Sequence, residues 1–84
     1  MKSDSRSRGN LAFAFTLRKL RYKAQIAQET LASQAGLDRA YMSMLERGFH
    51  SPTLETIFKL LPSLGVTFTQ FASALEKERS KMKI

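Results

Sequence analysis

Three glycines divide the middle of this 84-residue chain into short segments with the periodicity of amphipathic helices. Gly36, Gly48 and Gly65 each follow a run in which apolar residues recur every three or four positions. Glycine readily adopts the positive φ found just after a helix, so each of the three predicts a helix end. No stretch alternates apolar and polar residues long enough to predict a strand. The sequence therefore predicts an all-α fold.

Residues suited to capping helices divide the chain into five elements. The predicted helices span residues 10–23, 28–35, 39–47, 54–64 and 68–79. Asn10 is a possible N-cap of the first helix, and Asp38 and Thr53 are good N-caps of the third and fourth. Thr67 followed by Gln70 matches the capping box, in which the cap and the third helical residue bond each other's backbone.

The chain is long enough for one domain, and its basic residues gather at both ends. Fourteen Lys and Arg residues outnumber seven Asp and Glu residues, which gives a net charge of +7. We expect a packed domain at residues 10–79, a flexible basic arm at 1–9 and a basic tail at 80–84. A charge of this size and sign indicates a polyanionic partner.

Several classes of function lack the residues that they need. The chain has no cysteine and one histidine, His50, with no carboxylate cluster near it in sequence. It therefore offers no metal site, no cofactor site and no catalytic set, and we expect it not to be an enzyme. No apolar run approaches the roughly 20 residues that span a bilayer, so we expect a cytoplasmic protein with no membrane partner.

Residues 28–47 are expected to form two short helices joined by a tight turn at Gly36 and Leu37, which is helix-turn-helix geometry. Met42 and Leu45 would face the body of the domain. The outward side chains of the second of these helices can touch base edges or phosphates: Arg39, Ala40, Ser43, Met44 and Arg47. A chance corner between two helices could look similar, but the basic charge favours the DNA-binding interpretation.

A family resemblance is carried by the segments Leu17–Arg21, Gln28–Leu37, Tyr41–Gly48, Ser51–Ile57 and Leu64–Val66. In these segments the chain resembles the Cro/C1-type (XRE-type) helix-turn-helix regulators. The match runs in order and without gaps over about residues 13–71. The segment Leu37–Tyr41 is also similar to the small controller proteins of restriction–modification systems.

The resemblance implies a five-helix bundle of the lambda-repressor-like type, with the helix-turn-helix at the second and third helices. It also implies a homodimer that regulates transcription by binding double-stranded DNA at a (pseudo)palindromic operator. Helix 39–47 would lie in the major groove. No sensor domain is present, so no small-molecule effector is evident.

Individual roles follow from the resemblance where residues match. Gln28 corresponds to a family glutamine that bonds a DNA phosphate, and its position at a helix N-terminus independently favours an anion. The base-reading positions hold Arg39, Ala40, Ser43 and Met44. Tyr41 matches a position that touches backbone or base, and Arg47 completes the outward face. His50 is either an exposed loop residue or a phosphate contact.

Arg21 and Glu46 match a family ion pair between the first and third helices; the alternative is a solvated surface contact. Three residues depart from the family pattern. Gln25 stands where the family has glycine, and Ala27 replaces a Ser or Thr cap. Pro62 falls inside the fourth helix, where it should kink or split that helix.

The last two helices carry more large apolar residues than one small core needs: Phe58, Leu61, Phe68, Phe71 and Leu75. We expect some of them to form the dimer surface. Two other functions remain open from the sequence. One is an antitoxin of the same fold that binds a toxin protein and its own promoter. The other is a protein-interaction domain without DNA binding, which the charge of +7 disfavours.

Overall fold

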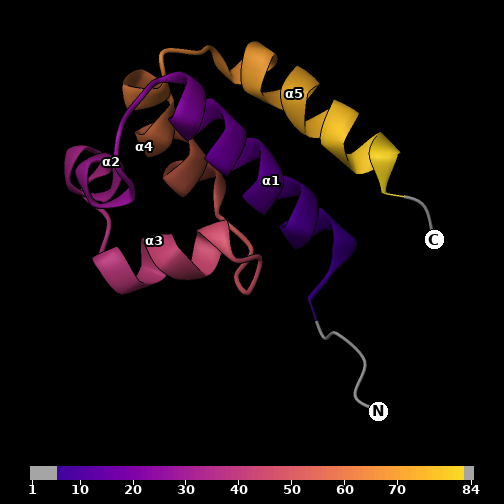
Figure 1. Ribbon diagram of the computed structural model, residues 1–84, viewed down its shortest axis with the longest axis horizontal. Coiled ribbons are helices and arrows are strands. Elements are labelled where there is room, and N and C mark those ends of the chain that lie inside the picture. Colours follow the sequence, from indigo (N-terminus) through magenta and orange to yellow (C-terminus); the bar gives the residue numbers. More distant parts are fainter. Residues whose placement is uncertain (1–5, 83–84) are drawn as a thin grey trace.

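A computed structural model describes residues 6–82 and contains five helices within that range (Figure 1). The helices are α1 (Arg8–Lys23), α2 (Gln28–Ala35), α3 (Arg39–Glu46), α4 (Leu54–Leu64) and α5 (Phe68–Lys81). Residues 6–82 include no strand, which confirms the all-α fold. None of the helices in this range is long and apolar enough to cross a membrane.

α1 runs through the centre of the domain. It contacts both α3 and α5 and lies between them in Figure 1, while α2 packs against α3 and α4. Every helix contributes to one core, whose largest members are Phe13, Leu17, Leu31, Met42, Leu45, Leu60, Leu64 and Phe71. The rings of Phe13 and Phe71, 5.7 Å apart at their centroids, join α1 to α5.

The predicted caps set the start of the last three helices. Asp38 accepts hydrogen bonds from the backbone N–H groups of Ala40 and Tyr41. Thr53 accepts one from the N–H of Thr56. Thr67 and Gln70 form the reciprocal capping box. These bonds satisfy N–H groups that have no partner within their own helix.

The first helix starts earlier than its sequence predicted. The N-cap is Ser7, whose hydroxyl accepts from the N–H of Asn10 at 3.0 Å, so Asn10 itself lies inside α1. Residues 8 and 9 therefore belong to the helix and not to a flexible arm. Arg6 and Ser7 precede the helix, and residues 1–5 of the predicted arm lie outside the described residues.

The ends of two other helices also differ from prediction. α3 stops at Glu46, with Arg47 as its C-cap, because Gly48 has a φ of 83° and the chain turns away. The N–H of Phe49 then donates to the carbonyl of Met44 at 3.0 Å. α5 continues to Lys81, so the basic tail predicted at residues 80–84 begins within a helix.

Pro62 does not split α4, which is continuous through it, so that part of the prediction is wrong. Proline removes the hydrogen bond to the carbonyl four residues earlier. Only two residues of α4 follow Pro62, and the helix end is closed beyond it. There the N–H of Gly65 donates to the carbonyls of Leu61 and Pro62 at 2.9 and 3.2 Å.

Both departures at the start of the helix-turn-helix are visible in the turn before α2. Gln25 has a φ of 60°, a left-handed conformation that is unfavourable for residues other than glycine. Ala27 is the N-cap of α2 and makes no side-chain cap bond. Ile26 and Leu31, on either side of this cap, both pack into the core and fix the entry of the chain into α2.

We predict that Ala27→Ser stabilises the protein. A serine hydroxyl at this extended N-cap can accept a bond from the first turn of α2, worth about 1 kcal/mol. The measurement is urea unfolding followed by circular dichroism. Ala72→Ser, on the exposed surface of α5, is the control and should stabilise nothing. An unchanged midpoint for Ala27→Ser would mean that water already caps α2 as well as a hydroxyl does.

Candidate nucleic-acid interface

The five outward residues predicted on the recognition helix do share one face. Met42 and Leu45 are completely buried beneath α3. Arg39, Ala40 and Arg47 are exposed on the other side. Ser43 and Met44 are half-buried between them, so the five residues form a continuous stripe, which we call the α3 stripe. Residues of this stripe include no acid.

Arg39 occupies the first turn of α3 and points into solvent. Its Nη1 lies 3.9 Å from Oε2 of Glu29, at the start of α2, and both side chains are more than two-thirds exposed. An ion pair this long and exposed contributes about 0–1 kcal/mol. Arg39 can therefore leave Glu29 for another acceptor at little cost. This contact between Arg39 and Glu29 was not predicted from the sequence.

Glu46 and Arg21 form a buried two-pronged ion pair that fixes α3 against α1. Nε of Arg21 donates to Oε2 of Glu46 at 2.6 Å, and Nη2 donates to Oε1 at 3.0 Å. The two side chains are only 10% and 3% exposed, so the alternative of a solvated surface contact is excluded. The hydrogen bond to Glu46 raises the pKa of Arg21 above its ordinary value.

Two further donors converge on Glu46, and neither was predicted from the sequence. Nε2 of Gln28 donates to Oε1 of Glu46 at 3.0 Å, which ties the start of α2 to the end of α3. Nη1 of Arg18 donates to the main-chain carbonyl of Glu46, also at 3.0 Å. Arg21 adds a bond from Nη1 to the carbonyl of Ile26. Glu46 thus connects α1, α2 and α3. These bonds hold α3, which carries the α3 stripe, in place against α1 and α2.

The bond to Glu46 orients the side-chain amide of Gln28 but uses only one of its two N–H donors. An ionised carboxylate only accepts, so the Gln28 amide must turn its nitrogen toward Glu46. This nitrogen carries two N–H bonds, and Glu46 accepts one of them. The other N–H lies at the N-terminus of α2, where the helix dipole favours negative charge.

Tyr41 and His50 lie at one edge of the α3 stripe. Tyr41 is half-buried, and its hydroxyl is 3.5 Å from the hydroxyl oxygen of Thr56 on α4. Its ring faces that of His50, with centroids 5.9 Å apart. His50 itself is exposed in the loop after α3. The structure therefore brings both residues to the same edge, with Tyr41 held partly against the core.

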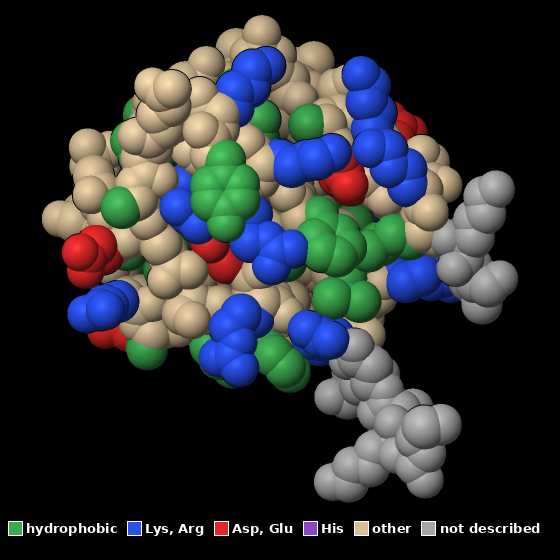
Figure 2. Space-filling view, in the orientation of Figure 1, with side chains coloured by type: hydrophobic (Ala, Val, Ile, Leu, Met, Phe, Trp, Pro, Cys, Tyr) green, Lys and Arg blue, Asp and Glu red, His purple; other side chains and the backbone are tan. Residues whose placement is uncertain are grey.

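A basic cluster covers the C-terminal end of the stripe, where Arg47 meets the loop after α3. The guanidinium groups of Arg47 and Arg6 lie 5.2 and 4.9 Å from the ring centroid of Phe49. Nη1 of Arg6 also donates to the carbonyl of Arg47 at 2.9 Å. Lys and Arg side chains predominate over acidic ones on the face drawn in Figure 2. Arg6 was predicted to lie in a flexible arm, so its contact with this loop was not expected from the sequence.

Clusters of possible metal ligands and unpartnered buried polar side-chain groups are both absent from the described residues. Within residues 6–82 no group of three or more His, Asp or Glu side chains is arranged to hold a metal ion. The buried side-chain nitrogen and oxygen atoms of this part of the chain all have hydrogen-bond partners.

Comparison with known proteins agrees with this geometry. A family described as helix-turn-helix matches residues 17–71. Control protein C.MunI from a Mycoplasma species is 38% identical over 69 residues, covering 81% of this chain and 93% of that protein. Control protein C.BamHI from Bacillus amyloliquefaciens is 39% identical over 57 residues, covering 67% of this chain and 70% of that protein.

Solved structures include the restriction–modification controller protein C.Esp1396I, crystallised as a tetramer in complex with its natural 35 base-pair operator. Its chain superposes on this one with a TM-score of 0.81 and 30% identity, covering 88% of this chain and 97% of that one. The family match spans most of the chain, and α2 and α3 have the expected geometry. This chain therefore belongs to the helix-turn-helix family of Cro/C1 (XRE) type.

Proposed function

We propose that this protein regulates transcription by binding an operator of double-stranded DNA through the α3 stripe. The observation that carries the proposal is the stripe itself: an exposed, acid-free helix face whose helix is braced by Glu46 against α1 and α2. A recognition helix must present its side chains at fixed positions to read base edges. The controller proteins among its relatives, one of them crystallised with its operator, support the proposal.

The DNA contacts divide into two kinds. Arg39, Ala40, Ser43 and Met44 face the base edges in the major groove. Gln28 bonds a phosphate through its remaining N–H, and the basic side chain of Arg47 and the loop residue His50 follow the backbone. Phosphate contacts of this kind set the register of the protein, whereas base contacts give sequence preference.

The protein acts as a homodimer in this proposal, because one recognition helix reads too few base pairs for useful specificity. The expected seam is an exposed apolar patch formed by Leu54, Phe58 and Phe68, which are 63%, 51% and 41% exposed. The rings of Phe58 and Phe68 already meet, at 5.3 Å between centroids. Leu61 and Phe71 are buried in the core, so these two residues are not available for the predicted dimer surface.

Operator binding places the protein with the DNA in the cytoplasm, and it requires no catalysis. The direct test selects bound sites from random duplexes with the full chain. We expect a two-fold symmetric consensus whose half-sites are about one helical turn, or about 34 Å, apart. Recovery of duplexes with no shared sequence, at the same affinity as unselected DNA, would refute operator recognition.

We predict that Phe58→Glu weakens the dimer by at least about tenfold, because it places a charge in the centre of the apolar patch. Sedimentation velocity across a concentration series measures the effect. Tyr22→Glu, an equally drastic change at an exposed aromatic residue of α1, is the control. Equal dissociation constants for the two variants would show that the seam lies elsewhere.

A further inference from the structure

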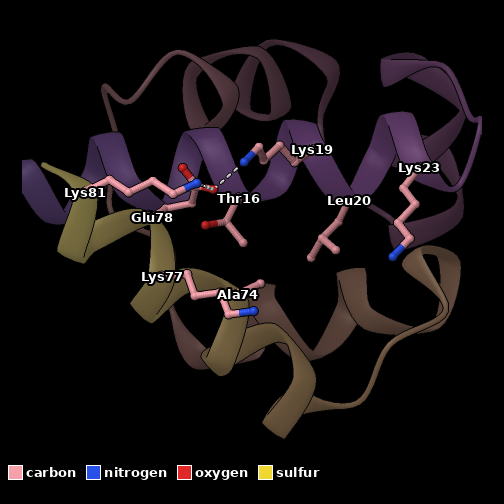
Figure 3. A pocket seen from close by; sticks show the side chains of 8 residues that line it. All are labelled: Thr16, Lys19, Leu20, Lys23, Ala74, Lys77, Glu78 and Lys81. Atoms are coloured by element: carbon pink, nitrogen blue, oxygen red, sulfur yellow. Dashed lines mark hydrogen bonds and ion pairs between the residues drawn. The ribbon is translucent and has the colours of Figure 1, made fainter.

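A long groove runs between α1 and α5, well away from the α3 stripe. It consists of two adjoining depressions of about 250 and about 460 Å³. The two share Leu20, Lys23 and Ala74, so they form one continuous groove. Figure 3 shows Leu20 from α1 and Ala74 from α5 on its floor, with lysines on both sides.

The groove combines an apolar floor with a strongly basic rim. Four lysines line it, Lys19 and Lys23 from α1 and Lys77 and Lys81 from α5, against a single acid, Glu78. Nζ of Lys19 lies 2.6 Å and Nζ of Lys81 3.5 Å from Oε2 of Glu78. These contacts lower the pKa of Glu78, with Lys19 having the larger effect. The one acid of the groove is therefore already paired with two of its lysines.

The remaining two lysines have no acidic partner among residues 6–82. Neither Lys23 nor Lys77 takes part in an ion pair or side-chain hydrogen bond within that range, yet both stand over apolar floor. Two lysines without an acidic partner at the border of an apolar groove attract an anion. The groove therefore favours a ligand that is apolar on one side and acidic on its flanks.

We propose that the α1–α5 groove binds an acidic amphipathic helix of a partner protein. Apolar side chains of that helix would lie on Leu20 and Ala74, and its Asp or Glu residues would pair with Lys23 and Lys77. Docking of an amphipathic helix into a groove between two helices is a common mode of peptide recognition. This surface is additional to the DNA interface and does not depend on it.

The length of the groove favours a helix over a small anion. Its lining on α5 extends from Gln70 to Lys81. At 1.5 Å per residue this is about 16 Å, or about three helical turns. A small-molecule site usually buries most of its ligand within walls, whereas both depressions of this groove are only partly enclosed.

The geometry also argues against a second copy of this chain as the occupant. The groove side of α5 carries Gln70, Ala74, Lys77 and Lys81. At 100° per residue, Phe68 of the proposed dimer patch lies about 120° from Ala74 and about 180° from Lys77 around the helix axis. A second copy would also bring another +7 of charge. A dimer can thus form while both grooves stay open.

DNA bound at the α3 stripe leaves the groove accessible as well. α1 lies between α3 and α5 in Figure 1, so the groove and the recognition helix are on different sides of α1. A partner helix can therefore bind while the operator is occupied. Such an arrangement would let a DNA-bound regulator recruit another protein.

The test uses the full-length protein and a displayed library of helical peptides about 16 residues long, roughly four turns. We expect enriched peptides with apolar residues at i, i+3 or i+4 and i+7 flanked by Asp and Glu. They should shift the backbone amide NMR signals of Leu20 and Ala74. Lys23→Glu/Lys77→Glu should weaken them at least tenfold, and peptides with Lys in place of the acids should bind that double variant better than wild type.

The control is Arg8→Glu/Lys59→Glu, which changes the net charge equally outside the groove and should bind the peptides like wild type. Selected operator duplex checks that both double variants remain folded and DNA-competent, which separates this proposal from the proposed function. Three outcomes would overturn it: no enrichment, peptides that shift signals at Phe58 and Phe68 instead, or equal weakening by both double variants.

Discussion

Glu46→Ala should lower the free energy of unfolding by about 3 kcal/mol, because it leaves a buried guanidinium without its counter-charge. Arg21 is 10% exposed and gives two of its hydrogen bonds to this carboxylate. Only its bond to the carbonyl of Ile26 would survive. In a domain of this size the loss corresponds to a fall of about 15 °C in Tm.

Thermal and urea unfolding of the purified protein measure the effect, with Glu76→Ala as the matched control. Glu76 is an exposed acid of α5, and its removal should change stability by less than about 0.5 kcal/mol. Glu46→Gln should fall between the two, since an amide keeps one acceptor but not the charge. Equal stability of the Glu46 and Glu76 variants would mean that the buried pair contributes nothing net to folding.

Helix boundaries, including those of the helix-turn-helix, could be predicted from sequence where their determinants are local. Asp38 caps α3 from within its own turn, and Thr67 and Gln70 bond each other across three residues. Gly36 ends α2 with a φ of 68°. Each of these features needs only neighbouring residues, so spacing and residue type were sufficient to find it.

The errors arose where distant contacts or competing local signals decide. Ser7 and Asn10 are both good N-caps, and the selection of Ser7 coincides with the contact of Arg6 with the carbonyl of Arg47, 41 residues away in sequence. Some of the apolar residues on α4 and α5 were expected to form a dimer surface, without a distinction between them, and Phe71 packs onto Phe13 of α1. Periodicity marks an apolar face without saying which neighbour covers it.

The candidate site shows the same division. The α3 stripe followed from helical spacing, and the pairing of Arg21 with Glu46 followed from family resemblance. The link from Gln28 to Glu46 was missed, although an amide at the start of α2 and a buried acid at the end of α3 were both in view. Joining them requires the angle between the two helices, which comes from the packing of Leu31, Met42 and Leu45.

This link changes what a substitution at Gln28 should do. Gln28→Ala removes the proposed phosphate contact and also one of the donors to Glu46, so it should weaken operator and random DNA alike and cost about 1 kcal/mol of stability. Gln28 therefore serves as the comparison for a residue that reads sequence, provided that both variants are assayed well below their unfolding temperatures.

Arg39→Ala should behave differently from Gln28→Ala, because its guanidinium can bond O6 and N7 of one guanine together. We expect it to cost about 1–3 kcal/mol on the selected operator and to relax preference at one base pair in each half-site. Binding to scrambled duplex should change much less. The long contact between Arg39 and Glu29 should compete only weakly with the bonds from Arg39 to guanine, since both side chains are exposed.

Arg39→Lys separates base reading from simple charge. A lysine keeps the positive charge but cannot reproduce the two parallel N–H bonds, so it should bind the operator nearly as poorly as the alanine variant. If Arg39 only adds charge beside the backbone, Arg39→Lys will bind like wild type. In that case Arg39→Ala will also lower the salt slope by about one per protomer without changing base preference. Titrating both variants against operator and scrambled duplex over a salt series decides the matter, and uniform weakening on both duplexes would remove Arg39 from the residues that read sequence.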